Sequence, residues 1–102
     1  MAELSTNHFL FLGAALFVIG MMGVLTRRNV LVIFMCVEMM IAAVAITFVA
    51  FSHESGTIQG QAFVLFAVAV AAAESAVGLA IIIALDRRGK APDVAELQEL
   101  RD

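Results

Sequence analysis

The chain has 102 residues, of which 63% are hydrophobic and only 15% are charged, and its net charge is −3. Soluble domains are about half apolar and about a quarter charged, and a chain this short has too little interior to bury the excess. The composition therefore excludes an ordinary soluble domain and indicates a membrane protein.

Three apolar runs follow one another, and each has close to the about 20 residues that a helix needs to cross a bilayer. Lipid offers the backbone no hydrogen-bonding partner, so runs of this length without strand-like alternation must be helices. We predict helices over about 5–25, 30–51 and 62–85. The expected fold class is an all-α membrane protein with three transmembrane helices, formed by residues 1–88.

The connections over residues 26–29 and 52–61 are short, so successive helices should be antiparallel neighbours. Residues 89–102 form a tail. Asp93 and Glu96 have the spacing of a capping box, so the tail is either a short surface helix or a frayed end.

The basic residues indicate which way the chain crosses the membrane. All six lie in the first loop or after the third run, at Arg27, Arg28, Arg87, Arg88, Lys90 and Arg101. With three crossings these segments share one side, and an excess of Lys and Arg marks the cytoplasmic side. We therefore expect the N-terminus outside and the C-terminus in the cytoplasm.

Two carboxylates interrupt the apolar runs. Glu38 lies roughly 12 Å, and Glu74 roughly 16 Å, from the cytoplasmic ends of their helices. An ionised side chain at that depth costs about 2.5–3.5 kcal/mol, unless it keeps a proton, pairs with a cation or faces water. A carboxyl that gains and loses a proton suits a relay, so both are candidate proton-transfer residues. The alternative is that they only join helices by hydrogen bonds.

The surroundings of Glu74 favour protein neighbours. Small residues recur every four positions beside it, at Ala72, Ala76, Ala80 and Ala84. Such stripes let helices approach closely in membranes. Three helices offer little interior for a carboxylate, so we expect partner subunits around this helix.

Arg27 and Arg28 could act only in topology, or could favour the ionised form of nearby carboxylates as auxiliary electrostatic residues. The lone Cys36 is expected to be a small buried hydrophobe, and Gly20 and Gly23 to mark close helix contact. No cofactor-binding or metal site is predicted, and the absence of a basic patch interleaved with aromatic residues gives no reason to expect nucleic acid.

Three stretches, "RRNVLVIFMCVEMM", "GQAF" and "AAAESAVGLAIIIALDRR", resemble subunit K of the proton-translocating NADH:quinone oxidoreductases, respiratory complex I. The resemblance covers roughly residues 9–88. It implies that Glu38 and Glu74 are the family's two membrane glutamates and that Arg27 and Arg28 are its loop arginines. One departure is that family members often carry asparagine shortly after the first glutamate, where this chain has alanines over 42–43.

The resemblance also implies a setting. The chain would be a translocase subunit in the inner membrane of a bacterium, contributing both glutamates to a proton path coupled to quinone reduction. Its partners would be lipid and other membrane-arm subunits, including the antiporter-like ones. The complex uses NADH, flavin, iron–sulfur clusters and quinone, and none is expected to bind this chain, which has no redox centre or independent activity of its own.

Three other functions remain open at the level of sequence. One is the homologous small subunit of a multisubunit sodium/proton antiporter, and another is an assembly subunit with no proton role. A small multidrug exporter fits less well, because the chain has three predicted spans and neither Trp nor Tyr for cation–π binding.

Overall fold

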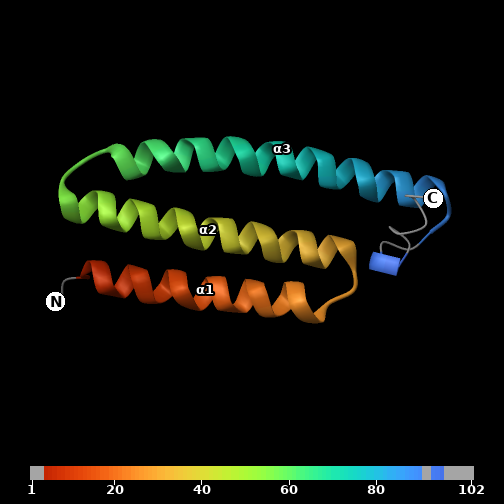
Figure 1. Ribbon diagram of the computed structural model, residues 1–102, viewed down its shortest axis with the longest axis horizontal. Coiled ribbons are helices and arrows are strands. Elements are labelled where there is room, and N and C mark those ends of the chain that lie inside the picture. The colour runs from red at the N-terminus through yellow and green to blue at the C-terminus, as the bar shows by residue number, and fades with distance from the viewer. Residues whose placement is uncertain (1–3, 91–92, 96–102) are drawn as a thin grey trace.

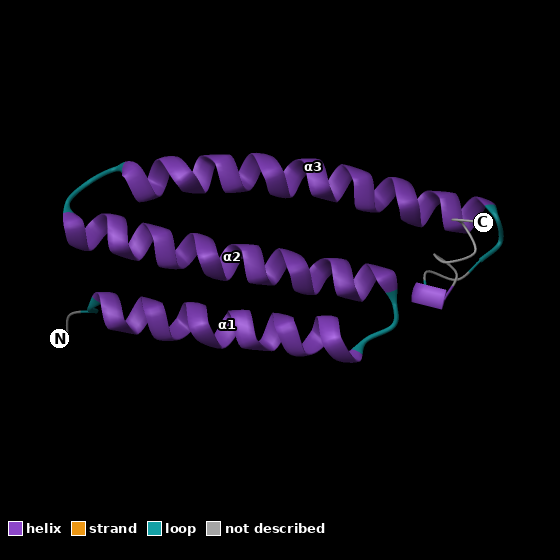
Figure 2. Cartoon of the chain, in the orientation of Figure 1, coloured by secondary structure: helices purple, strands orange, loops and turns teal. Residues whose placement is uncertain are grey.

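The computed structural model describes residues 4–90 and 93–95. Its three long helices are α1 (Thr6–Thr26), α2 (Val30–Ser55) and α3 (Gln59–Arg87). Each is long and apolar enough to cross a membrane. They run side by side with α2 in the middle (Figure 1), and the described residues contain no strand (Figure 2). The predicted all-α class with three spans is confirmed.

The C-terminal end of α2 and the N-terminal end of α3 both extend beyond the bounds expected from the sequence. α2 continues to Ser55, four residues past the end of its apolar run at Phe51, and α3 begins at Gln59, ahead of Ala62. Backbone hydrogen bonds can continue where polar side chains reach water, so hydropathy marks the lipid boundary and not the helix end. α2 stops at Gly56, whose φ of 71° is the left-handed conformation that glycine adopts readily.

The starts of α1 and α2 are set by polar residues. The Asn29 side chain accepts hydrogen bonds from the backbone N–H groups of Leu31 at 2.9 Å and Val32 at 3.4 Å. Ser5 precedes α1, and its backbone N–H donates to Nδ1 of His8 at 2.9 Å. The hydrogen bonds of Asn29 and Ser5 thus satisfy backbone N–H groups that would otherwise have no partner at the start of a helix.

The contact between α1 and α2 is a close approach of backbones. A Cβ atom on Gly20 would lie 2.7 Å from Cγ of Met40 and 2.8 Å from the carbonyl oxygen of Cys36. A Cβ atom on Gly23 would collide with Sγ of Cys36. The predicted role of these glycines is therefore confirmed, and the free, half-buried Cys36 serves as a packing residue.

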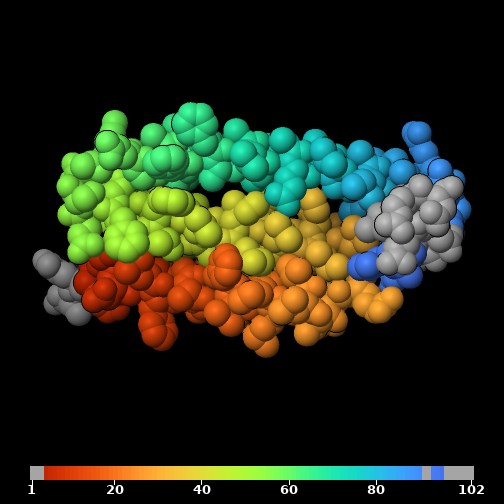
Figure 3. Space-filling model, viewed as in Figure 1, coloured from red at the N-terminus to blue at the C-terminus, as the bar shows by residue number. Residues whose placement is uncertain are grey.

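The contact between α2 and α3 combines a close backbone approach with larger side chains. A Cβ atom on Gly60 would collide with the carbonyl oxygen of Phe48. The ring of Phe34 fills the space where a side chain on Gly78 would be. The rings of Phe48 and Phe63 stack with their centroids 5.8 Å apart. In the space-filling view a gap is visible between α2 and α3 near the middle of this contact (Figure 3).

The first loop and the tail meet at one end of the three helices, as the predicted crossing pattern requires. Asn29 and Asp93 form an isolated antiparallel bridge, and the N–H of Val94 donates to the carbonyl of Arg28 at 3.0 Å. The N-terminal end of α1 and the α2–α3 loop lie at the opposite end (Figure 1).

Candidate functional site

Glu38 lies on the face of α2 that meets α3, and its side chain is half-buried. The hydroxyl of Ser75 on α3 donates to Oε1 of Glu38 at 3.4 Å. This bond places Glu38 level with Ser75 along the helix axes, and Ser75 is the residue directly after Glu74. The structure therefore gathers Glu38, Ser75 and Glu74 into one intramembrane region.

Glu74 is also half-buried, and it leaves α3 beside Ser75. Successive helical residues are separated by about 100° around the axis, so Glu74 points to a different side of α3 from Ser75. Within residues 4–90 and 93–95, no hydrogen bond or ion pair joins the carboxylates of Glu38 and Glu74. The Ser75 hydroxyl, and not a contact between the two carboxylates, connects Glu38 to α3.

An aromatic contact borders this polar link on the side of the arginine loop. Phe34 lies one turn before Glu38 on α2, and Gly78 lies one turn after Ser75 on α3. Because the Phe34 ring packs over Gly78, it fixes the spacing of the two helices next to the hydrogen bond. Apolar packing around a polar pair also strengthens its electrostatic interaction.

Ser75 was missed as a site residue by sequence reasoning, although a signal was present. It is a polar residue inside the third apolar run and follows Glu74 directly. Polar side chains within membranes tend to bond across helices, so a serine at the depth of the other glutamate was a candidate partner.

The alanine stripe lies away from the contact with α2. Ala72, Ala76 and Ala80 are exposed, and Ala84 is half-buried. Close contact with α2 is made on another face of α3, by Ser75 and Gly78. Packing through the alanines stays a prediction about a partner subunit.

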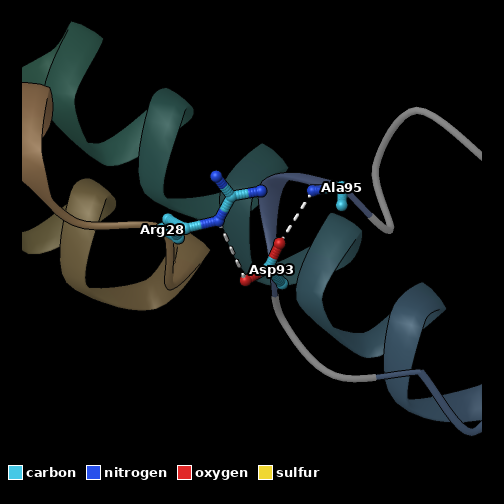
Figure 4. Close-up of polar contacts among 3 residues, drawn as sticks. All are labelled: Arg28, Asp93 and Ala95. Atoms are coloured by element: carbon cyan, nitrogen blue, oxygen red, sulfur yellow. Dashed lines mark hydrogen bonds and ion pairs between the residues drawn. The ribbon is translucent and has the colours of Figure 1, made fainter.

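The loop arginines lie at the end of the helices and interact locally. The N–H of Arg27 donates to the carbonyl of Gly23 at 3.0 Å. Arg28 points toward the tail, with its Nε 3.8 Å from Oδ2 of Asp93 (Figure 4), and its side chain is 73% exposed. Arg28 therefore pairs with Asp93 and not with a membrane glutamate. Within the described residues, neither Glu38 nor Glu74 forms an ion pair with a cation.

Asp93 caps backbone at the start of the tail, which is the role that the predicted capping box gives it. Its Oδ1 accepts a hydrogen bond from the N–H of Ala95 at 2.8 Å (Figure 4). The other half, Glu96, lies outside the described residues.

A hollow of about 490 Å³ opens among the three helices. It is lined by Phe17, Val24, Val37, Met40, Ile41, Val44, Ala67 and Val70. The lining is apolar and includes neither glutamate, so this hollow is packing space beside the polar link. Over the described part of the chain, no group of three or more His, Cys, Asp or Glu residues could hold a metal ion.

Three helices long and apolar enough to span a membrane, with a hydrogen-bonded carboxylate between two of them, define a small multi-pass membrane protein with a polar site among its spanning helices. Residues 8–102 match the family described as NADH-ubiquinone/plastoquinone oxidoreductase chain 4L. The chain therefore belongs to the chain 4L, or subunit K, family of NADH-quinone oxidoreductase, respiratory complex I.

Individual relatives agree with this assignment over their whole length. The chain is 57% identical over 102 residues to NADH-quinone oxidoreductase subunit K of Thermomicrobium roseum, with 100% of both chains covered. It is 53% identical over 98 residues to subunit K 2 of Geotalea uraniireducens, covering 96% of this chain and 98% of the relative. It is 49% identical over 102 residues to subunit K of Ralstonia pickettii strain 12J, covering 99% of each.

Membership of this family confirms the resemblance noted in the sequence. It makes the chain a multi-pass membrane subunit of an oxidoreductase complex, with other subunits of that complex as its partners.

Proposed function

We propose that this subunit carries protons within the membrane arm of the complex, with Glu38 and Glu74 as the proton-transfer residues. The observation that supports this most is the hydrogen bond between Ser75 and Glu38, which holds a carboxylate inside the contact of two spanning helices. Helices can be joined by Ser, Thr, Asn or Gln at lower cost, so an ionisable group at this depth favours a change of protonation.

In this proposal only O–H bonds form and break on the chain. A proton that arrives on Glu38 or Glu74 neutralises the carboxylate and lowers its cost in lipid, and its departure restores the charge. Quinone reduction elsewhere in the complex supplies the energy that makes the transfer directional. The subunit is thus part of a translocase, and flavin, iron–sulfur clusters, NADH and quinone are bound by other subunits.

The surroundings of the site follow from the same proposal. The end that carries Arg27 and Arg28 faces the cytoplasm, because basic residues collect there, and the membrane is the bacterial inner membrane. The arginines act as auxiliary electrostatic residues at the entrance. Neighbouring membrane-arm subunits, including the antiporter-like ones, cover the exposed alanine face of α3, and lipid covers the rest.

The sodium/proton antiporter alternative has less support, because the three relatives described above are all named as subunits of NADH-quinone oxidoreductase. The alternative that matters is an assembly subunit with no proton role. It predicts that the carboxylates can lose their charge without loss of pumping.

The test uses Glu38→Gln, Glu74→Gln and the double variant in the complete enzyme, reconstituted in vesicles. Glutamine keeps the shape and the hydrogen bonds but cannot ionise. We expect the double variant to lose proton pumping by on the order of 100-fold, the lower end of what a positioned proton carrier contributes. Glu54→Gln, near the exposed end of α2, is the matched control and should pump normally. A normally assembled double variant that pumps at the wild-type rate would establish the assembly role instead.

A further inference from the structure

We propose that Ser75 is a positioning residue for proton transfer, which holds the Glu38 carboxylate against α3 beside Glu74. The inference rests on the proposed function and assigns a role to a residue outside the pair of glutamates. Its basis is the hydrogen bond from the Ser75 hydroxyl to Oε1 of Glu38, at 3.4 Å between oxygens on two different helices.

Ser75 differs from Thr26 and Thr47, two other hydroxyls of the spanning helices, in what it bonds. Thr26 and Thr47 donate back to carbonyls one turn earlier on their own helices, Met22 at 2.7 Å and Ala43 at 3.1 Å. That local bond is the usual way for a helical hydroxyl in an apolar setting to be satisfied. Ser75 instead donates to a carboxylate on the neighbouring helix.

A hydroxyl suits a partner that changes its charge. It can donate to the ionised carboxylate, and after a rotation it can accept a hydrogen bond from the protonated one. Ser75 and Glu38 can therefore stay joined in both protonation states and in either orientation of the carboxyl, whereas an N–H donor could not accept a hydrogen bond from the carboxyl O–H. The Glu38 carboxyl therefore keeps its place beside Ser75 each time it gains or loses a proton.

The packing next to the bond keeps the two residues within reach. Phe34 fills the space over Gly78, and these residues lie one turn from Glu38 and Ser75 respectively. A glutamate side chain has several rotatable bonds, and without a fixed partner its carboxylate could turn along the contact toward the helix ends. Because Ser75 is joined to Glu74 through the backbone, holding Glu38 to Ser75 also sets its place relative to Glu74.

The test compares Ser75→Ala, which removes the hydroxyl, with Ser75→Thr, which keeps it, in the complete enzyme in vesicles. We expect Ser75→Ala to lower proton pumping per assembled enzyme about tenfold, the effect of losing a hydrogen bond to a charged group, and Ser75→Thr to restore most of it. Thr47→Val is the matched control, because it removes an intramembrane hydroxyl from the α1 side of α2 and should leave pumping unchanged.

A spectroscopic readout separates positioning from a merely structural role. Infrared difference spectra on addition of NADH should contain a carboxyl C=O band that is lost in Glu38→Gln. We expect this band to shift in Ser75→Ala, to return in Ser75→Thr and to stay in place in Thr47→Val. If Ser75→Ala assembles poorly, Ser75→Cys, with a similar volume and a weaker donor, should show a smaller shift in the same direction.

Two failures are distinguishable. Normal pumping and an unshifted band in Ser75→Ala, together with impaired Glu38→Gln, would overturn the role of Ser75 and leave the proton-transfer role of Glu38 intact. Normal pumping and an unchanged spectrum in Glu38→Gln would overturn the proposed function, and the role of Ser75 with it.

Discussion

The two faces of α2 make different kinds of contact. Toward α1 the contact is built on close backbone approach alone, and toward α3 a close backbone approach at Gly60 is combined with aromatic rings and the Ser75–Glu38 hydrogen bond. Lipid chains are as apolar as leucine, so helices in a membrane associate through close packing and polar bonds. The face of α2 toward α1 uses close packing, and the face toward α3 adds a polar hydrogen bond to it.

The spacing of residues along α2 allows both contacts at once. The residues that meet the glycines of α1 are Cys36, Met40, Ala43 and Thr47. The residues that meet α3 include Phe34, Glu38, Phe48 and Ser52. Each series repeats at intervals of three, four or a sum of threes and fours, so each forms one stripe along the helix. A stable contact on one stripe leaves the other free to carry a polar site.

The largest effect is expected from overfilling the α1–α2 contact. In Gly20→Val the new side chain meets the carbonyl oxygen of Cys36, which is backbone and cannot move aside. Overpacking of this kind costs about 1–3 kcal/mol, and the helices must separate. Thermal unfolding of the purified complex should occur at lower temperature and the amount of assembled subunit should fall. Ala15→Val, on an exposed face of α1, is the control, and equal losses in both variants would contradict the comparison.

A smaller effect on stability, but a clear one on pumping, is expected from the α2–α3 contact. In Gly78→Ala the added methyl meets the ring of Phe34, a side chain that can turn, so the loss should lie near the lower end of about 1–3 kcal/mol. The displaced helix would carry Ser75 away from Glu38 and lower the pumping rate. Phe34→Leu in the same chain makes room and should recover it. Failure of this second change to restore pumping would argue against the spacing role of Phe34.

The cap of α2 should contribute about as much as other helix caps. Asn29→Ala removes the acceptor for the N–H groups of Leu31 and Val32, and we expect a loss of about 1 kcal/mol in the free energy of unfolding. Asn29→Asp keeps an acceptor oxygen and should lie close to wild type. Chemical denaturation of the two variants in the same detergent distinguishes them, and an equal loss in both would show that the cap bond is not the cause.

The smallest effect is expected from the link between the loop and the tail. Arg28 and Asp93 are 73% and 37% exposed, and exposed ion pairs contribute at most about 1 kcal/mol. Arg28→Gln should therefore change stability little, and what change there is should disappear in high salt. Asp93→Asn should behave in the same way, since asparagine can still accept from the N–H of Ala95. A large loss in high salt would show that the link is not mainly electrostatic.

The sequence predicted the parts of the structure that lipid dictates. Lipid requires helices in long apolar runs, so the three spans could be predicted, and so could the matched level of Glu38 and Glu74 along their helices. Helix ends were less predictable, because Gly56 and not the last apolar residue stops α2. The pairing of Ser75 with Glu38 depends on how two helices are rotated against each other, which hydropathy does not encode. The pairing of Arg28 with Asp93 needed the path of the tail.

The central claim is that the intramembrane glutamates change their protonation when the complex turns over. Infrared difference spectra of the complete enzyme on addition of NADH measure this directly, through the C=O bands of protonated carboxyls. The account predicts bands in the wild-type enzyme that are absent from the Glu38→Gln, Glu74→Gln double variant at equal enzyme content. Identical spectra from the two enzymes would mean that both carboxyls keep one protonation state throughout, and would contradict it.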